Sequence, residues 1–311
     1  MAMRVVHNAY TPKETVELCS RAGVQKANMR IDKVFFSSFI AGNLLSFACA
    51  AVLSTNTAPW YQENAPGLIR MIGALIFPFG LTAIVVTGTD LCTGSFMFTT
   101  ISVLHRRLSV LKMLQHWVVT FFGNLAGSLF IVMIIGYGGV FNLTSYHNEV
   151  EIFANAKVVT PEWHMIFLRG IGANWLVCLA CFLAMMAREY FSKVMAIWWP
   201  TFAFICLGFD HVVANMFLIP IAIFLGAPKI TVGLYIWKSM IPALLGNLIG
   251  GGVFVGVVYW YLHVSSEPSP IPIDGDVYGD SAPLMGRNID QSPPNGESES
   301  EERKKSAENM V

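Results

Sequence analysis

Two ionisable side chains lie next to each other in the middle of a long apolar run. Asp210 and His211 follow Gly208 and a phenylalanine. The run extends between Lys193 and Lys229, and Asp210 is the only formally charged side chain within it. Charged groups at the depth of a bilayer are costly, rare and usually functional, and histidine changes protonation near neutral pH. The pair therefore predicts a site that handles a proton or a small ion.

This apolar run is too long for one straight crossing of a membrane. About 33 residues at roughly 1.5 Å each span roughly 50 Å, whereas the hydrocarbon core is about 30 Å thick. A break at Gly208 resolves the mismatch, because two half-helices would meet near the midplane and their unpaired backbone groups would line a polar cavity. A second long stretch, residues 68–100, has a break at residues 87–94 with a single acid, Asp90. We expect the two broken stretches to meet at one site.

The broken stretches belong to two halves of the chain with the same order of motifs. Each half has an asparagine in its first span, an acid in a broken second span and a Gly-Asn pair in its third span; these residues are Asn43, Asp90 and Asn124, then Asn174, Asp210 and Asn247. Three spans per half force the halves to insert with opposite topology. The sequence therefore predicts an all-α polytopic membrane protein of six transmembrane helices in two inverted three-helix repeats, with the second and fifth spans broken.

The composition agrees with a polytopic membrane protein. Charged residues make up 13% of the chain, against about 25% in an average soluble domain, and the mean hydropathy is +0.55. The formal net charge of +0 gives no indication of a nucleic-acid partner, and no metal-binding or phosphate-binding motif predicts a cofactor. Cys178 and Cys181 form a CxxC, but on a membrane helix we expect them to pack as small buried side chains.

Polar segments flank the apolar part of the chain. Residues 1–33 are expected to form an N-terminal segment with a short surface helix, because Thr11-Pro12-Lys13-Glu14 is a capping box. Residues 34–264 form the predicted membrane transport domain, and its two halves are joined by a polar loop at 137–162. Residues 265–311 have the composition of a disordered acidic tail.

Lysine and arginine indicate the orientation of the chain. The first 33 residues carry six of these side chains and the connector 105–112 carries three. The loop at 55–67 carries none, and the loop at 137–162 carries only Lys157. Short loops rich in Lys and Arg stay in the cytoplasm. We therefore expect a multi-pass protein of the plasma membrane with both termini in the cytoplasm.

Four separated motifs resemble those of the formate/nitrite transporter family, and they occur in the family's order within about residues 10 to 263. They are Thr89-Asp90-Leu91-x-Thr93, Phe122-Gly123-Asn124-Leu125-x-Gly127, Gly208-Phe209-Asp210-His211-x-x-Ala214-Asn215-Met216 and Gly246-Asn247-x-Ile249-Gly250-Gly251-Gly252. The chain is most similar to fungal nitrite-transporting members. The resemblance implies an aquaporin-like protomer in a homopentamer, with a separate pore in each protomer. The chain departs from bacterial members at Asp210, where they usually have glutamate.

The resemblance also implies which side chains line the pore: a polar centre, two apolar constrictions beside it and an approach from the outside. The implied residues are Thr93 and His211 on either side of the centre, Phe77 and Leu81 at one constriction, Phe204 at the other, and Asn174 and Lys157 on the outer approach. Asp210 is a further candidate site residue because of its place at the break beside His211.

A small anion needs help to pass such constrictions. Stripped of water among phenylalanine and leucine side chains, it would lose tens of kcal/mol of solvation, so crossing as the neutral acid is the cheaper route. Lys157 and Arg169 can gather anions, and the half-helix N-termini beside Thr93 and His211 offer backbone N–H donors. The proton would come from His211 or from water relayed past it. The expected function is therefore transport of nitrite together with a proton.

Each of these residues also has a purely structural explanation. A histidine in an apolar helix is usually a hydrogen-bonded core residue, and Arg169 could simply extend to the membrane interface. Lys157 stands in a predicted polar loop, where solvated lysines are the rule. Phe77 and Phe204 are equally compatible with ordinary packing.

Other functions fit the sequence less well. A water or glycerol channel shares the inverted repeat, but neither residues 88–95 nor residues 208–215 contain the Asn-Pro-Ala expected at its half-helix starts. A membrane enzyme would need a catalytic constellation, and the core offers only His211 with two isolated aspartates, so we expect no enzyme. Formate, lactate and hydrosulfide are alternative substrates within the family.

Overall fold

The computed structural model describes residues 9–267 and 270–273. The described helices all belong to one compact unit that ends at Pro272. The acidic tail expected from residue 265 onward therefore lies almost entirely outside the described residues.

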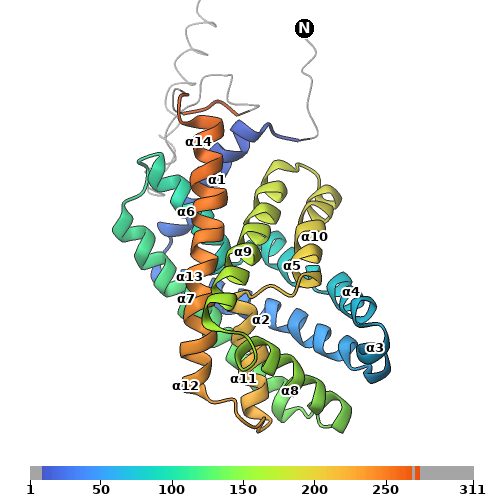
Figure 1. The fold of residues 1–311 in the computed structure, drawn as a ribbon. Coiled ribbons are helices and arrows are strands. Elements are labelled where there is room, and N and C mark those ends of the chain that lie inside the picture. Colours follow the sequence, from blue (N-terminus) through green and yellow to red (C-terminus); the bar gives the residue numbers. More distant parts are fainter. Residues whose placement is uncertain (1–8, 268–269, 274–311) are drawn as a thin grey trace, which may run out of the picture. The chain divides into compact units, whose positions relative to one another are not determined.

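Helices form nearly all the regular structure of the described part of the chain (Figure 1). In chain order they are α1 (Pro12–Ala27), α2 (Ile31–Asn56), α3 (Pro59–Asn64), α4 (Pro66–Ile76), α5 (Pro78–Thr87), α6 (Cys92–Leu104), α7 (Val110–Tyr137), α8 (Thr144–Val158), α9 (Trp163–Met186), α10 (Tyr190–Cys206), α11 (Val212–Phe224), α12 (Val232–Tyr235), the π-helical η1 (Ile236–Met240), α13 (Ile241–Leu248), the π-helical η2 (Ile249–Val257) and α14 (Val258–Val264).

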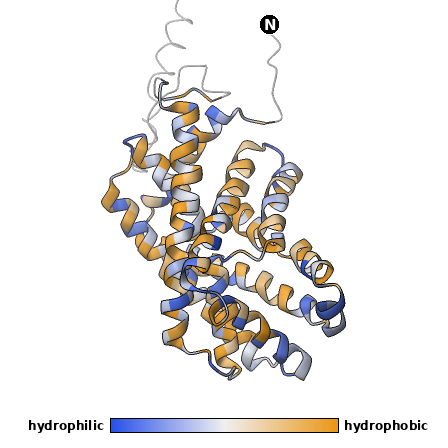
Figure 2. Ribbon diagram, viewed as in Figure 1, coloured by the Kyte–Doolittle hydropathy of each residue, from blue (hydrophilic) through white to orange (hydrophobic). Residues whose placement is uncertain are grey.

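Within the described residues, five helices are long and apolar enough to cross a membrane: α2, the α4–α5 pair, α7, α9 and the continuous segment from α12 to α14. Two shorter apolar helices, α6 and α11, accompany them. Hydrophobic residues dominate the long helices, whereas hydrophilic residues gather at α3 and α8 (Figure 2). The prediction of an all-α protein with several apolar spans is confirmed.

The chain leaves the helix at both predicted breaks. Gly88 ends α5 and Gly208 follows α10, with φ angles of 72° and 70° in the left-handed region that favours glycine. After each glycine a short extended segment carries the acid, and α6 and α11 then begin. The second predicted span has a further interruption, because Pro78 begins α5 directly after Phe77.

Close backbone contact holds each half together, with α2 along α7 in the first and α9 along α13 in the second. A Cβ atom on Gly127 of α7 would lie 2.0 Å from the Phe39 carbonyl oxygen of α2. A Cβ atom on Gly246 of α13 would lie 2.2 Å from the Phe167 carbonyl oxygen of α9. Both distances are too short for any real side chain, so glycine is required for the two helices to approach.

The capping box predicted at the start of α1 is present. Thr11 accepts a hydrogen bond from the Glu14 amide, and the Glu14 side chain accepts one from the Thr11 amide. However, α1 is more than a surface helix, since one of its faces packs against α6 and α9. Burial would raise the pKa of Glu17 on this face, but hydrogen bonds from Arg107 and Arg21 outweigh it and hold the pKa below its usual value.

The expectation of an irregular polar loop at 137–162 was wrong in its middle part, which forms the helix α8. Val150, Ala154 and Val158 recur at four-residue intervals and are buried. The helix packs against α11 and α2 through this stripe. The stripe is short and surrounded by polar residues, which is why composition alone suggested a loop. Lys157 consequently lies in the last turn of a helix.

Candidate functional site

The centre of the site is a hydrogen bond between the two broken stretches. Thr93, in the first turn of α6, and His211, at the N-cap of α11, are joined by a 2.7 Å contact between Thr93 Oγ1 and His211 Nε2. Both side chains are buried. The N-termini of α6 and α11 therefore meet at the contact between Thr93 and His211. Each helix directs the positive end of its dipole toward this contact.

The backbone of α11 determines which nitrogen of His211 carries hydrogen. Nδ1 accepts a hydrogen bond from the Ala214 amide at 3.2 Å, so in the neutral ring the hydrogen is on Nε2 and is donated to Thr93 Oγ1. A doubly protonated ring would place a second N–H against the Ala214 N–H, beside the positive end of the helix. The geometry therefore favours a neutral His211 that donates a hydrogen bond.

Two asparagines, which we call the clamp asparagines, hold the breaks in place. Asn124 of α7 accepts from the Cys92 amide at 2.9 Å and donates to the Asp90 carbonyl at 3.0 Å. Asn247 of α13 accepts from the Val212 amide at 2.8 Å and donates to the Asp210 carbonyl at 3.0 Å. Each also donates to a carbonyl in the first apolar span of its half: Asn124 to Ser38 of α2, and Asn247 to Gly170 of α9.

Asn174 connects the two halves from α9. Its amide nitrogen donates to the Thr93 carbonyl at 3.0 Å and to the Asn247 carbonyl at 2.7 Å. Cys178, one turn later, donates its thiol to the Thr93 carbonyl at 3.3 Å. These contacts position the start of α6. All six cysteines are free thiols, so Cys178 and Cys181 act here as buried packing residues.

Asp210 lies at the centre of a basic cluster on the α8 side of the site. Lys157 Nζ is 3.2 Å from its Oδ1, and Arg169 Nη1 is 3.8 Å from its Oδ2. Lys157 also donates to the carbonyls of Gly208 and Phe209 at 2.9 and 2.7 Å. Backbone groups of the break therefore compensate its positive charge together with Asp210. The side chain of Arg169 is 39% exposed and is the member of the cluster that solvent can reach.

Asp90 has an equivalent basic cluster on the α1 side. Lys26 Nζ lies 3.0 Å from its Oδ1, and His116 Nε2 lies 3.0 Å from its Oδ2. Ser95 Oγ donates to Oδ1 at 2.6 Å. Sequence reasoning missed Lys26, because no local pattern links α1 to a loop 64 residues away. His116 carried a signal, since it is an ionisable residue within an apolar helix, the same criterion that indicated His211.

The apolar residues of the predicted constrictions are buried and close together. The rings of Phe77 and Phe204 meet edge to face with centroids 5.4 Å apart, and the Phe204 ring is 6.0 Å from that of His211. Leu81, one turn beyond Phe77, lines a cavity of about 280 Å³ that also contains Lys26 and Asp90. We call this cavity the α1-side vestibule. Phe77 and Phe204, which were predicted for different constrictions, are thus in direct contact.

Together these features define a class of protein: a multi-pass membrane transport protein in which two broken helices meet at a buried polar centre beside apolar side chains. The chain belongs to the formate/nitrite transporter family, whose model matches residues 13–261. Members of this family are transporters and channels.

Individual relatives agree with this assignment. A protein of Methanothermobacter thermautotrophicus described as a probable formate transporter is 32% identical over 82% of this chain and 97% of its own length. Among solved structures, an FNT family ion channel matches with a TM-score of 0.73 at 30% identity, covering 80% of this chain and 98% of its own. A pentameric formate channel with formate bound matches with a TM-score of 0.67 at 28% identity, covering 75% and 97%.

Proposed function

We propose that this protein transports a small monovalent anion of a weak acid, together with a proton, through a pore between α5–α6 and α10–α11. The observation that carries the proposal is the hydrogen bond between Thr93 and His211. It joins two half-helix starts at a buried centre flanked by Phe77, Leu81 and Phe204. Such a centre can bind one small polar solute and nothing that keeps a full hydration shell.

The proposed mechanism uses a neutral His211. The Nε2–H group and the Thr93 hydroxyl hydrogen-bond to the solute, while the two helix N-termini stabilise residual negative charge. The apolar side chains disfavour a bare anion, which takes up a proton from water relayed past His211 and crosses as the neutral acid. It releases the proton on the far side, so the net transport is anion plus proton.

Basic residues at both entrances support an anionic substrate. Arg169 and Lys157 lie at the α8 side, and Lys26 lies in the α1-side vestibule. Positive charge at a narrow entrance raises the local anion concentration. Lys157 lies 3.2 Å from Asp210 and donates to two carbonyls of the break, whereas Arg169 is 3.8 Å from the same carboxylate and 39% exposed. We therefore assign much of the attraction on the α8 side to Arg169.

The proposed arrangement in the membrane is that of the sequence prediction. We infer six spans in two inverted repeats, with α4–α6 and α10–α11 as the broken second and fifth spans. We also infer cytoplasmic termini, because Lys and Arg are concentrated at the α1 face. The plasma membrane is the proposed location. One structural relative is described as a pentameric formate channel, and we propose a homopentamer for this chain.

Nitrite and formate are the leading substrates. Several relatives are described as formate transporters or channels. Nitrite is the substrate that the similarity to fungal members suggests. Both are planar, singly charged and close in size, so the centre can accommodate either.

Uptake into proteoliposomes tests the proposal. Labelled nitrite, formate, lactate, hydrosulfide and glycerol are offered to the reconstituted full-length protein across external pH values from 5 to 8, with and without a protonophore. We expect saturable uptake of nitrite or formate that rises as external pH falls and is reduced by the protonophore. Uptake that is flat with pH and insensitive to the protonophore would contradict proton coupling, and glycerol uptake without anion uptake would contradict the substrate class.

A further inference from the structure

The two buried acids share two kinds of partner. A polar residue five positions after each acid donates to it: Ser95 to Asp90 at 2.6 Å, and Asn215 to Asp210 at 3.3 Å. In each half a lysine from outside the broken span forms an ion pair with the acid: Lys26 with Asp90, and Lys157 with Asp210. This correspondence makes any difference between the two clusters informative.

Of the two acids, Arg169 contacts only Asp210. A second difference lies on the third span of each half. His116 of α7 and Ser239 of η1 each stand eight residues before the clamp asparagine of their half. Ser239 Oγ accepts a hydrogen bond from Asn215 at 3.1 Å, and His116 Nε2 lies 3.4 Å from Ser95 Oγ. The α1 side therefore has a titratable ring where the α8 side has a hydroxyl.

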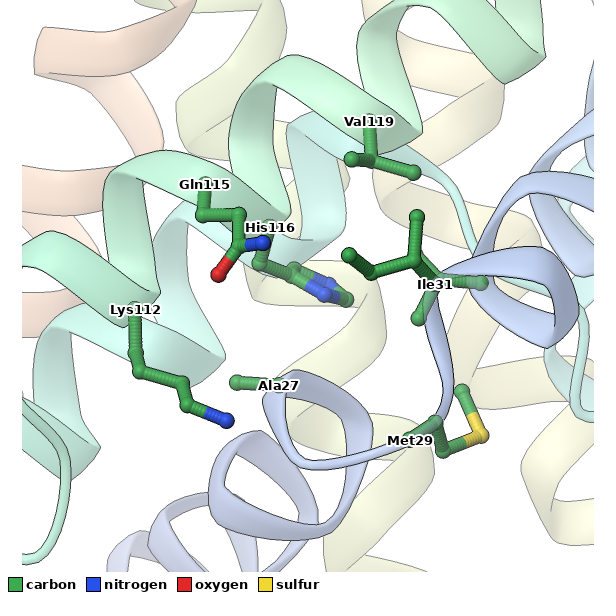
Figure 3. A pocket seen from close by; sticks show the side chains of 8 residues that line it. Ala27, Met29, Ile31, Lys112, Gln115, His116 and Val119 are labelled. Carbon is green, nitrogen blue, oxygen red and sulfur yellow. The ribbon is translucent and has the colours of Figure 1, made fainter.

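His116 lies between two cavities and lines one of them. Through Nε2 it reaches Asp90, which lines the α1-side vestibule. It also lines a second cavity of about 90 Å³, between α7 and the corner that joins α1 to α2. In Figure 3 the ring lies between Gln115 and Ile31, and the Lys112 ammonium extends toward Ala27. Nδ1 is buried and has no hydrogen-bond partner among the described residues.

The charged groups around His116 come from each element packed against it. Asp90 and Lys26 form one ion pair at 3.0 Å, and the Lys112 ammonium contacts Asn28 at 3.4 Å. At the start of α2, Arg30 and Asp32 are occupied with each other. When His116 is neutral, the negative charge of Asp90 and the positive charge of Lys26 cancel. A proton on His116 gives the cluster at the vestibule wall a net charge of +1.

We propose that His116 is a proton-binding site, reached from the 90 Å³ cavity, that controls how strongly the α1-side vestibule attracts anions. The proton adds a positive charge beside Asp90 and competes with Lys26 for that carboxylate. The unpaired Nδ1 is the atom at which the proton arrives, because Nε2 faces Asp90. Ser239 cannot change charge in this way, so the effect belongs to the α1 face alone.

This inference rests on the proposed function, because its consequence is a change in anion affinity. A unit charge within about 8 Å of a water-filled vestibule changes the local anion concentration by about 3- to 10-fold. We therefore expect the half-saturating anion concentration at the α1 face to fall by that factor when the pH at this face falls from 8 to 6.

Vesicles of defined orientation test the inference with the full-length protein and labelled formate as the probe. Initial uptake is measured from the α1 face in one vesicle orientation and from the opposite face in the other, with the far side kept at pH 7.5. His116→Ser introduces the residue of the other half, and His116→Gln retains a hydrogen-bond donor toward Asp90. His105→Gln is the matched control, since His105 is at the same face and contacts Trp260.

The expected result is a pH-dependent half-saturating concentration at the α1 face in the wild type and in His105→Gln. The two His116 variants should keep the rise in maximal uptake rate that proton coupling causes. Their half-saturating formate concentration should change less than twofold between pH 8 and 6. Retention of the full wild-type pH dependence in both variants overturns the inference while leaving the proposed function intact. If neither variant assembles, equal pH dependence at the two faces of the wild type overturns it. A wild type that moves no anion refutes the proposed function itself.

Discussion

At the scale of single residues, His211 has two structural tasks in addition to its place at the centre. It caps α11 by accepting the Ala214 amide, and it joins the two halves through Thr93. A substitution that removes the ring therefore changes stability and transport together, and only variants that separate these tasks are informative.

His211→Phe fills the volume of the imidazole but provides neither the cap nor the Nε2–H donor. We expect transport to be abolished and the protein to lose about 1 kcal/mol of stability from the missing cap. His211→Asn is the matched control, because asparagine is a good N-cap residue but lacks the imidazole Nε2–H that reaches Thr93. It should recover the part of the stability that the cap supplies without restoring transport. Anion uptake by either variant at the wild-type rate would show that the ring serves only packing.

Glu149 of α8 provides a pH-dependent test of stability away from the pore. Burial raises its pKa to about 7, and the hydrogen bond from Gln62 offsets only part of that effect. The folded state holds this proton more tightly than the unfolded state does, so stability is highest below pH ~4.5 and is lost as pH rises toward 7.

Glu149→Gln removes the charge and can still accept from Gln62. We expect the melting temperature of this variant to exceed that of the wild type by roughly 5 °C at pH 8, and the difference to shrink strongly at pH 5. Thermal unfolding in detergent at the two pH values measures it. An equal offset at both values would mean that the buried charge does not determine the stability here.

At the scale of elements, the breaks depend on groups that are distant in the sequence. One clamp asparagine in each half makes two hydrogen bonds to the break. It donates to the carbonyl of the buried acid and accepts from the first amide of the helix that follows the break. Within a membrane no water can replace these bonds, so irregular backbone persists only where protein groups satisfy it.

Asn124→Ala and Asn247→Ala each leave one buried amide and two buried carbonyls without their partner. We expect each to lose about 3 to 5 kcal/mol of stability and to reduce the yield of assembled protein, by similar amounts because the contacts match. Asn247→Asp keeps the acceptor for Val212 but places a buried carboxylate oxygen against the Asp210 and Gly170 carbonyls, so it should lose at least as much. Chemical denaturation and size-exclusion chromatography compare them, and a loss confined to one half would contradict the equivalence of the two clamps.

For the whole molecule, the proposed homopentamer with a separate pore in each protomer has a measurable consequence. The complex in mild detergent should have about five times the mass of the 34.3 kDa chain. When wild type and His211→Phe are co-expressed, uptake should fall in direct proportion to the fraction of variant chains. A steeper decline would mean that the protomers act together, and a monomeric mass would contradict the homopentamer.

The sequence by itself determined the class of the fold. Charge-free runs of twenty or more residues have one stable outcome in a membrane, and a glycine beside a lone acid in the middle of such a run marks a break. For this reason the breaks at Gly88 and Gly208 and the start of α1 at Thr11 were predicted correctly. The role of His211 as a pore residue stays a prediction.

Only the tertiary structure decided which groups meet. The pairing of Thr93 with His211 was implied by family resemblance, whereas Lys26 and His116 at Asp90 were not predicted at all. These contacts join helices whose separation in sequence carries no periodic signal. The contact between Phe77 and Phe204 likewise depends on how α5 and α10 cross. Local patterns encode where a helix begins, breaks and buries a face, but the partner of a buried charge is set by the packing of the whole domain.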